Sequence, residues 1–282
     1  MSLYQSAIIP AASFSQYPMT MVRPTGEVGR WVQCLWQVNR VIRADMPPAT
    51  GTDSSANHRI NEKIYPDGGA SLTFIVSSTH ASAFYFHNTQ VCNYHWQLSN
   101  DYLSVRLYPG AARVLLGLDV ADIASHEVDL CSLTFPRKDS LLRLLDALPG
   151  QPPQHQLTLL QQWLTQLQQT PCHKPGKWMN LLSVVDQPLQ PLQDLASERG
   201  ISRRTLERQL RVQAGVSPKQ LDMCARIRFA RQQLILDQED LSQIALQCGF
   251  YDQAHFTNVF RQHTQETPAN YQQRKMAQIS NR

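Results

Sequence analysis

The chain has 282 residues, of which 42% are hydrophobic and 17% are charged. This length is enough for two domains, and the composition is ordinary for a soluble globular protein. No apolar run reaches the roughly 18 residues of a membrane span, and residues 1–10 lack the basic start of a secretory signal, so we expect a cytoplasmic protein with no membrane partner. The six cysteines are scattered with no Cys-x-x-Cys pair, so the sequence predicts no disulfide framework, no metal and no other cofactor.

The net charge of +4 is concentrated in one part of the chain. Between Arg199 and Arg231 there are nine basic side chains and two acidic ones. Such a segment is typical of proteins that bind polyanions. A solvated helix face is the alternative that charge alone leaves open.

Residues 30–108 have the pattern of β-structure. Short apolar and aromatic runs cover residues 31–42, 70–76, 84–87, 91–98 and 102–108, and turn residues such as Pro66-Asp67-Gly68-Gly69 separate several of them. Strands at this spacing predict a barrel or a sandwich. Five side chains of this region either line a ligand pocket or form the barrel core: Trp36, Tyr65, Tyr85, His87 and Trp96.

Two helices are expected after the strands, at residues 140–148 and 156–167, where leucines recur at helical spacing. The second carries an apolar stripe that either folds onto the barrel or packs against a second subunit in a homodimer. Its members are Leu157, Leu160, Trp163, Leu164 and Leu167. Breaker residues at 170–176 place a linker between two domains, residues 1–170 and 177–282, with residues 171–176 as the linker itself.

The C-terminal domain contains an internal duplication. Residues 192–201 match residues 241–250, and after one inserted residue the match continues from 202–218 to 252–268. Both copies have a glycine, Gly200 or Gly249, that ends one helix, and then Ser202 or Asp252, which can cap the next. Inward-facing positions follow at helical spacing: Leu206 and Leu210 in the first copy, Phe256 and Phe260 in the second. Each copy is therefore predicted to be a helix-turn-helix unit.

These residues resemble the signature of the AraC/XylS transcription regulators over residues 177–274. The second copy carries Ile244-Ala245-x-x-Cys248-Gly249-Phe250-x-Asp252-Gln253-x-His255-Phe256-x-x-x-Phe260-Arg261, followed by Thr267-Pro268-x-x-Tyr271. One departure is Gln265, which stands where the first copy has Gly215 and the family usually has glycine; a positive φ there would cost roughly 1 kcal/mol. Tyr65-Pro66-Asp67-Gly68 and Pro109-Gly110-Ala111 are similar to motifs of a cupin-like sensor domain.

The resemblance implies an α+β multidomain protein. Its N-terminal domain would be a cupin-like β-barrel with flanking helices, and its C-terminal domain would be all-α with two helix-turn-helix motifs. The implied function is a sequence-specific transcription regulator, expected to be an activator. Its expected partners are double-stranded promoter DNA, RNA polymerase, a small-molecule effector and a second copy of the chain.

The outward positions of the second helix of each unit are the candidate DNA contacts. The family pattern implies base contacts by Arg204, Glu207 and Arg208, and amide, methyl and hydroxyl groups suited to adenine and thymine lie at Gln253, Ala254, Thr257 and Asn258. Phosphate contacts are expected from Ser202, Arg203, Arg211 and Arg261. Glu207 either accepts from cytosine or orients an arginine, and His255 is expected to pack near the turn.

An enzyme is not expected, because no catalytic motif is present. The histidines of the β-region, His80, His87 and His95, lack the close His-x-His spacing of a metal site. The alternative function that remains open is a cupin-type metal enzyme or a ligand-binding module fused to a DNA-binding domain.

Overall fold

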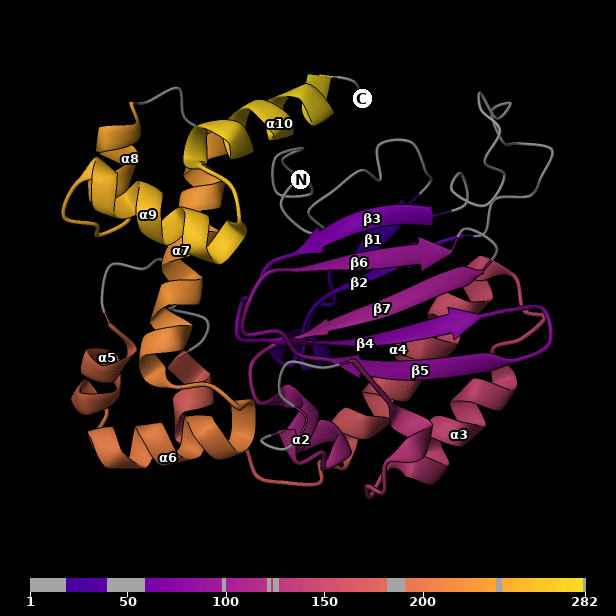
Figure 1. Ribbon diagram of the computed structural model, residues 1–282. Coiled ribbons are helices and arrows are strands. Elements are labelled where there is room, and N and C mark those ends of the chain that lie inside the picture. The colour runs from indigo at the N-terminus through magenta and orange to yellow at the C-terminus, as the bar shows by residue number, and fades with distance from the viewer. Residues whose placement is uncertain are drawn as a thin grey trace.

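The computed structural model describes residues 19–39, 59–97, 100–120, 123, 127–181, 191–236 and 240–280. Within these residues the chain forms a β-sheet region followed by a helical C-terminal region, as the sequence predicts (Figure 1). No helix in the described residues is both long enough and apolar enough to cross a membrane.

The main sheet has six antiparallel strands in the order β1-β2-β7-β4-β5-β8. These are β1 (Met19–Val22), β2 (Val32–Val38), β7 (Asp101–Leu107), β4 (Ala70–Val76), β5 (Ala81–Phe86) and β8 (Glu127–Asp129). Two further strands, β3 (Arg59–Ile64) and β6 (Cys92–Gln97), pair with each other and with no other described strand. The strands described here thus form an open sheet and a separate two-stranded sheet, so the prediction of a closed barrel is wrong. Hydrophobic spacing predicts strands but not whether their edges meet.

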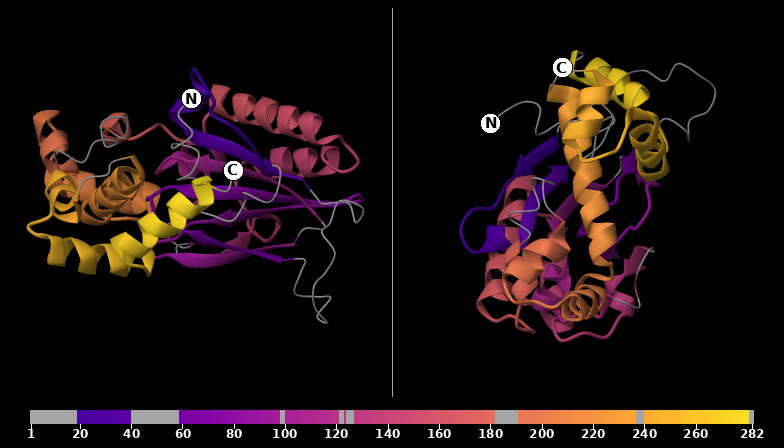
Figure 2. Two further views of the ribbon diagram at one scale, coloured as in Figure 1. Left: turned by 90° about the horizontal axis from the view of Figure 1, so that it is seen from above. Right: turned by 90° about the vertical axis from the view of Figure 1, so that its left-hand side faces the viewer.

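Helices cover one face of the main sheet because alternate residues of its central strands are apolar and point to that side. Phe74 on β4 pairs with Leu103 on β7, and both are fully buried. Helices α3 (Lys138–Ala147) and α4 (Pro153–Gln169) run along this face (Figure 2). The ring of Trp163 on α4 meets Phe74 edge-on, with 6.0 Å between the ring centroids. The sheet and these two helices form the N-terminal core.

The apolar stripe of α4 is used within the chain. Four of its five members, Leu160, Trp163, Leu164 and Leu167, are buried in the sheet core, and the Trp163 indole donates to Ser140 Oγ at 3.0 Å. Leu157 is half-buried against the same core. The burial of these side chains favours the alternative that the stripe packs onto the sheet within one chain.

The C-terminal region consists of helices joined by turns in its described residues. Its helices are α5 (Leu192–Glu198), α6 (Arg203–Ala214), α7 (Pro218–Leu236), α8 (Leu241–Gln247), α9 (Gln253–Thr264) and α10 (Pro268–Ser280). The long α7 joins the α5–α6 pair to the α8–α9 pair (Figure 1). Shorter elements outside this region are α2 (Ala111–Leu116) and the 3-10 turns η2 (Val28–Arg30), η6 (Leu130–Ser132) and η7 (Lys177–Leu181).

Packing does not separate the two regions at residues 171–176. The sheet core continues without a break into Trp178 of η7 and into Leu206 and Leu210 of α6. A second cluster surrounds Phe256 and Phe260 of α9, and it includes Tyr65 from the N-terminal region. Each pair of helices in the C-terminal region is therefore packed against the sheet region.

Candidate nucleic-acid interface

The two helix pairs, α5–α6 and α8–α9, have the same turn. Gly200 and Gly249 adopt φ angles of 71° and 74°, the left-handed conformation that glycine tolerates without strain. The next residue then donates its amide back to the preceding helix, Ile201 to Ala196 at 2.9 Å and Phe250 to Ala245 at 2.9 Å. Both pairs are thus helix-turn-helix units, as predicted, and we refer to them as the first unit and the second unit.

The expected side chains cap the second helix of each unit. Ser202 Oγ accepts from the Thr205 amide at 3.3 Å, and Asp252 Oδ1 accepts from the His255 amide at 2.7 Å. Such caps bind amide groups that the first turn of a helix cannot satisfy, which fixes where α6 and α9 begin. The residues at the N-terminal ends of α6 and α9 are therefore held in a defined position.

The inward faces of the two units are buried, but their chemistry differs. The first unit packs Ile201, Leu206 and Leu210. The second stacks aromatic rings, with centroid distances of 5.2 Å from Phe250 to Phe256 and 5.5 Å from Phe256 to Phe260. The spacing that places these residues inside also places their helix neighbours outside.

Helix α7 binds both units through polar side chains that the sequence analysis overlooked. The Asp222 carboxylate accepts from the Leu192 amide at the start of α5 at 2.8 Å, and Arg226 donates to the Gly249 carbonyl at the end of α8 at 3.2 Å. Burial, opposed by this hydrogen bond, raises the pKa of Asp222. The available signal was the spacing of Asp222 and Arg226, which stand four residues apart on α7.

The outer face of α6 is exposed and strongly basic. Arg203, Arg204, Glu207, Arg208 and Arg211 are all exposed, as predicted for DNA contacts. Arg203 Nε lies 3.0 Å from Glu207 Oε1, which favours the interpretation of Glu207 as a residue that orients an arginine. The guanidinium groups of Arg204, Arg208 and Arg211 make no polar contact within the described residues, so α6 offers three uncommitted cationic side chains.

The outer face of α9 is exposed and nearly neutral. Gln253, Ala254 and Asn258 are exposed, and Thr257 is half-buried. Arg261, a predicted phosphate contact, is exposed one turn further along. His255 lies edge-on to Phe250 with 5.6 Å between the rings, so it packs at the turn as expected.

Tyr251 is an exposed aromatic residue that the sequence analysis did not select. It lies between the buried Phe250 and the cap Asp252, and 87% of its surface is exposed. An aromatic residue directly before the cap of a recognition helix was the available signal. Its position makes Tyr251 a further candidate for contact with nucleic acid.

The five candidates for a ligand pocket do not gather around one cavity. Trp36 packs with Cys34 and Tyr102 in one cluster, Tyr85 lies in the sheet core, and Tyr65 lies in the hydrophobic cluster of the second unit. His87 is buried, and its Nδ1 lies 3.0 Å from the Gly69 carbonyl. The side chain of Trp96 is outside the described residues. Trp36, Tyr65 and Tyr85 are therefore divided among separate clusters, in part because alternate residues of a strand point to opposite faces of the sheet.

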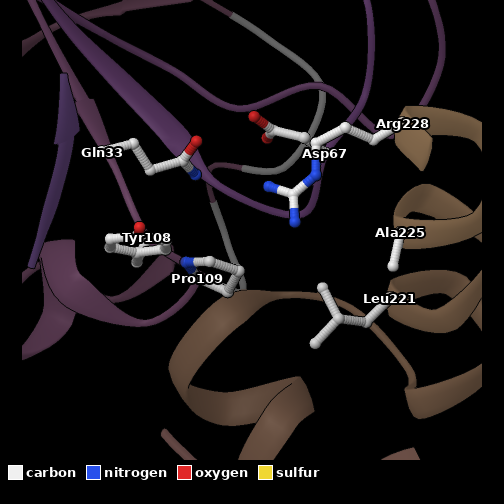
Figure 3. A pocket seen from close by; sticks show the side chains of 7 residues that line it. All are labelled: Gln33, Asp67, Tyr108, Pro109, Leu221, Ala225 and Arg228. Carbon is white, nitrogen blue, oxygen red and sulfur yellow. The ribbon is translucent and has the colours of Figure 1, made fainter. Parts of the chain in front are cut away.

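Two hollows lie elsewhere among the described residues. One, of about 20 Å³, lies where α7 meets the sheet region and has room for roughly one water molecule (Figure 3). Its lining residues are Gln33, Asp67, Tyr108, Pro109, Leu221, Ala225 and Arg228. The other, of about 380 Å³, is lined by residues such as Asn39, Asp101 and Gln156 and has room for a small metabolite.

Residues 195–274 match the family model of a helix-turn-helix domain. The HTH-type transcriptional activator RhaS from Klebsiella pneumoniae is 35% identical over 81 residues, which is 29% of each chain. The chain thus spans less than a third of the length of this relative. An AraC-type regulator structure from Chromobacterium violaceum is 30% identical and covers 35% of this chain and 91% of its own, with a TM-score of 0.33. ToxT from Vibrio cholerae is 12% identical and covers 76% of this chain and 97% of its own, with a TM-score of 0.39.

Proposed function

We propose that the chain is a sequence-specific transcription regulator of the AraC type that binds double-stranded promoter DNA, because residues 195–274 match a helix-turn-helix family model and resemble the activator RhaS. The observation that carries the proposal is the pair of helix-turn-helix units on one chain, each with a capped and exposed second helix. Two such helices suit successive major grooves on one face of DNA, about 10 base pairs apart.

The charge of the first unit supports DNA as its partner. The exposed arginines of α6 supply the electrostatic attraction to phosphate that dominates affinity for DNA. Arginine also pairs with guanine through two parallel hydrogen bonds, which is the commonest specific contact in the major groove. An exposed helix with these side chains therefore suits both general affinity and base reading.

The contacts are assigned by position on each helix. We assign base contacts to Arg204, Glu207, Arg208, Gln253, Ala254, Thr257 and Asn258, and phosphate contacts to Ser202, Arg203, Arg211 and Arg261. On this assignment the first unit supplies most of the electrostatic affinity. The second unit selects adenine and thymine through amide, methyl and hydroxyl groups.

The test is selection of bound fragments from genomic DNA with the purified full-length protein, followed by anisotropy titrations of an enriched site. We expect affinity for that site to fall steeply as salt rises, because phosphate contacts release counterions. Binding of the enriched site that is no tighter than binding of random duplex would remove the proposal.

The remaining features of a regulator are part of the same proposal. The likeness to RhaS, whose name describes a transcriptional activator, supports activation. We propose RNA polymerase as the partner in activation, a cytoplasmic location and a function without catalysis. The cleft of about 380 Å³ is where a small-molecule effector would be sought, by thermal shift against a metabolite screen. A homodimer would raise affinity for a repeated site through effective concentration, and sedimentation tests it.

A further inference from the structure

The C-terminal end of α9 is held by two side chains of the sheet region. Lys63, in β3, donates to the Thr264 carbonyl at 2.8 Å and lies 3.5 Å from the Glu266 carboxylate. The Tyr65 hydroxyl donates to Glu266 at 2.7 Å and accepts from Arg274 at 2.9 Å. We call Lys63, Tyr65, Glu266 and Arg274 the clamp. It joins the second unit to a segment about 200 residues away in the chain.

Tyr65 is also part of the hydrophobic core of the second unit. Only 6% of its surface is exposed, and it belongs to the same cluster as Phe256 and Phe260. The Arg231 guanidinium lies 3.8 Å from the centre of the Tyr65 ring, and Tyr271 meets that ring edge-on at 6.1 Å. The sheet region thus supplies a core residue to the second unit, so movement of one moves the other.

The charges of the clamp are well matched. The end of a helix carries a partial negative charge, so the Lys63 ammonium is favourable beside the last carbonyl groups of α9. Burial alone would raise the pKa of Glu266, but hydrogen bonds from Arg274 and Tyr65 and the charges of Arg274 and Lys63 hold it below its ordinary value. Hydrogen bonds between ionised groups are stronger than neutral ones. The clamp is therefore closed at neutral pH.

The closed clamp leaves the reading face of α9 open. Its contacts are to residues 264–266 and to Arg274, whereas Gln253, Ala254 and Asn258 are exposed toward the other end of the helix. Gln265 has a φ of 58°, which turns the chain sharply at the end of α9, where Thr264 and Glu266 are held. The clamp is thus compatible with DNA at the N-terminal end of α9.

The first unit rests on the same region through apolar contacts, since Leu206 and Leu210 of α6 belong to the sheet core. The segments on either side of this unit pack there as well. Leu221, at the start of α7, packs so closely on the loop after Tyr65 that a Cβ on Gly68 would lie 2.5 Å from its Cδ1. The side chains of Trp178 and Met179 pack on Gly110, where a Cβ would lie 3.2 Å from each. Both units are therefore fixed to one body, by apolar packing in the first and by the clamp in the second.

We propose that Lys63 and Tyr65 are positioning residues for DNA reading by the second unit, because they fix the orientation of α9 relative to α6. This inference rests on the proposed function. Two helices that enter successive grooves need a set orientation, and fixing it beforehand lowers the entropy lost on binding. The sheet region then controls base discrimination at the half-site that α9 reads, without contacting DNA.

The experiment uses the full-length chain and an operator selected with the wild-type protein. Gln253→Ala and Asn258→Ala first identify the half-site that α9 reads. The affinity for the intact operator is then divided by the affinity for an operator with one half-site scrambled. In a Lys63→Met, Tyr65→Phe double variant, we expect this ratio to fall at least about fivefold for the half-site of α9. The ratio for the half-site of α6 should remain as in the wild type.

Matched variants separate positioning from general damage. Tyr85→Phe and Lys138→Met remove a buried phenol and a lysine bonded to a carbonyl elsewhere in the sheet region, and both ratios should stay unchanged. The single variant Lys63→Arg keeps the cation and should retain most of the wild-type ratio for the half-site of α9. Equal losses at both half-sites, or no loss at either, would overturn the inference in variants whose circular dichroism matches the wild type. Failure of the wild type to bind any selected operator would instead remove the proposed function.

Discussion

The first and second units have the same helix-turn-helix backbone, but their exposed and buried side chains differ. Outside, α6 presents exposed arginines, and α9 presents Gln253, Ala254 and Asn258. Inside, the first unit is aliphatic and continuous with the sheet core, whereas the second has a separate aromatic cluster. Three features have the same role in both units: the glycine of the turn, the N-cap residue and the spacing of the buried positions. Those positions define the helix-turn-helix, and the others are free to take different chemistry.

The difference in the cores gives the largest expected effect. Phe256→Ala should lower the free energy of unfolding by about 3–5 kcal/mol, because it leaves a cavity between the rings of Phe250 and Phe260. Urea denaturation followed by circular dichroism measures this loss. Val212→Ala, at an exposed position of α6, is the control and should change stability by no more than about 0.5 kcal/mol. Similar values for both variants would contradict the assigned core.

The difference in charge predicts two kinds of arginine variant in the first unit. Arg208→Ala should cost about 1–3 kcal/mol at one base pair and relax specificity there, because Arg208 is assigned to a base. Arg211→Ala should weaken binding of all sequences alike and reduce the salt slope by about 1, because it is assigned to a phosphate. Affinities for operator and random duplex over a salt series measure both effects. An unchanged ratio of operator to random affinity in Arg208→Ala would refute its assignment.

The C-cap residue of α6 is Gly215, whereas that of α9 is Gln265. Gly215 and Gln265 both have positive φ, 69° and 58°, and glutamine is strained in that conformation. Gln265→Gly should therefore stabilise the protein by up to roughly 1 kcal/mol, and Gly215→Ala should destabilise it by a similar amount. Thermal unfolding of the two variants measures these opposite shifts. Shifts of the same sign would show that this backbone conformation does not set the difference.

Each unit contacts the sheet region through a titratable side chain, His87 at the first unit and Glu266 at the second. Their contributions to stability should change over different ranges of pH. Among the described residues, His87 Nε2 has no hydrogen-bond partner, and a Cβ on Gly215 of the first unit would lie 3.7 Å from it. Burial lowers the pKa of His87 from 6.5, with the Arg106 charge adding to this and the Gly69 carbonyl and Asp67 opposing it. A lowered folded pKa means that the unfolded chain takes up the proton first, so stability falls as pH drops below 6.5.

Glu266, in the clamp with Lys63 and Arg274, has a pKa below 4.5 and should keep its contribution until the pH falls below that value. Stability measured from pH 7.5 to 5 should therefore decline in the wild type and decline less in His87→Gln. Glu266→Gln should lose stability at neutral pH while keeping the slope between pH 7.5 and 5. Identical slopes in His87→Gln and the wild type would contradict the role given to His87.

Much of the helical region could be predicted because its signals are local. These signals are a glycine in a turn, a side chain that accepts from the amide three residues on, and apolar positions four residues apart. Each acts within one or two turns of helix. Strand β4 was predicted at its observed bounds because its alternation is strong, whereas β3, with the sequence Arg-Ile-Asn-Glu-Lys-Ile, has too few apolar residues to indicate a strand. Helix α2 was missed because six residues are too few for a clear period.

The sequence by itself determined the two units, the positions of their turns and caps, and the basic face of α6, since each depends on neighbours within a few residues. Only the tertiary structure decided that the sheet is open in the described residues, that the stripe of α4 is buried within the chain, and that the aromatic residues expected to share a pocket are divided among separate clusters. It alone brought Tyr65 against Glu266. These outcomes depend on which distant surfaces meet, and hydrophobic burial favours contact without specifying the partner.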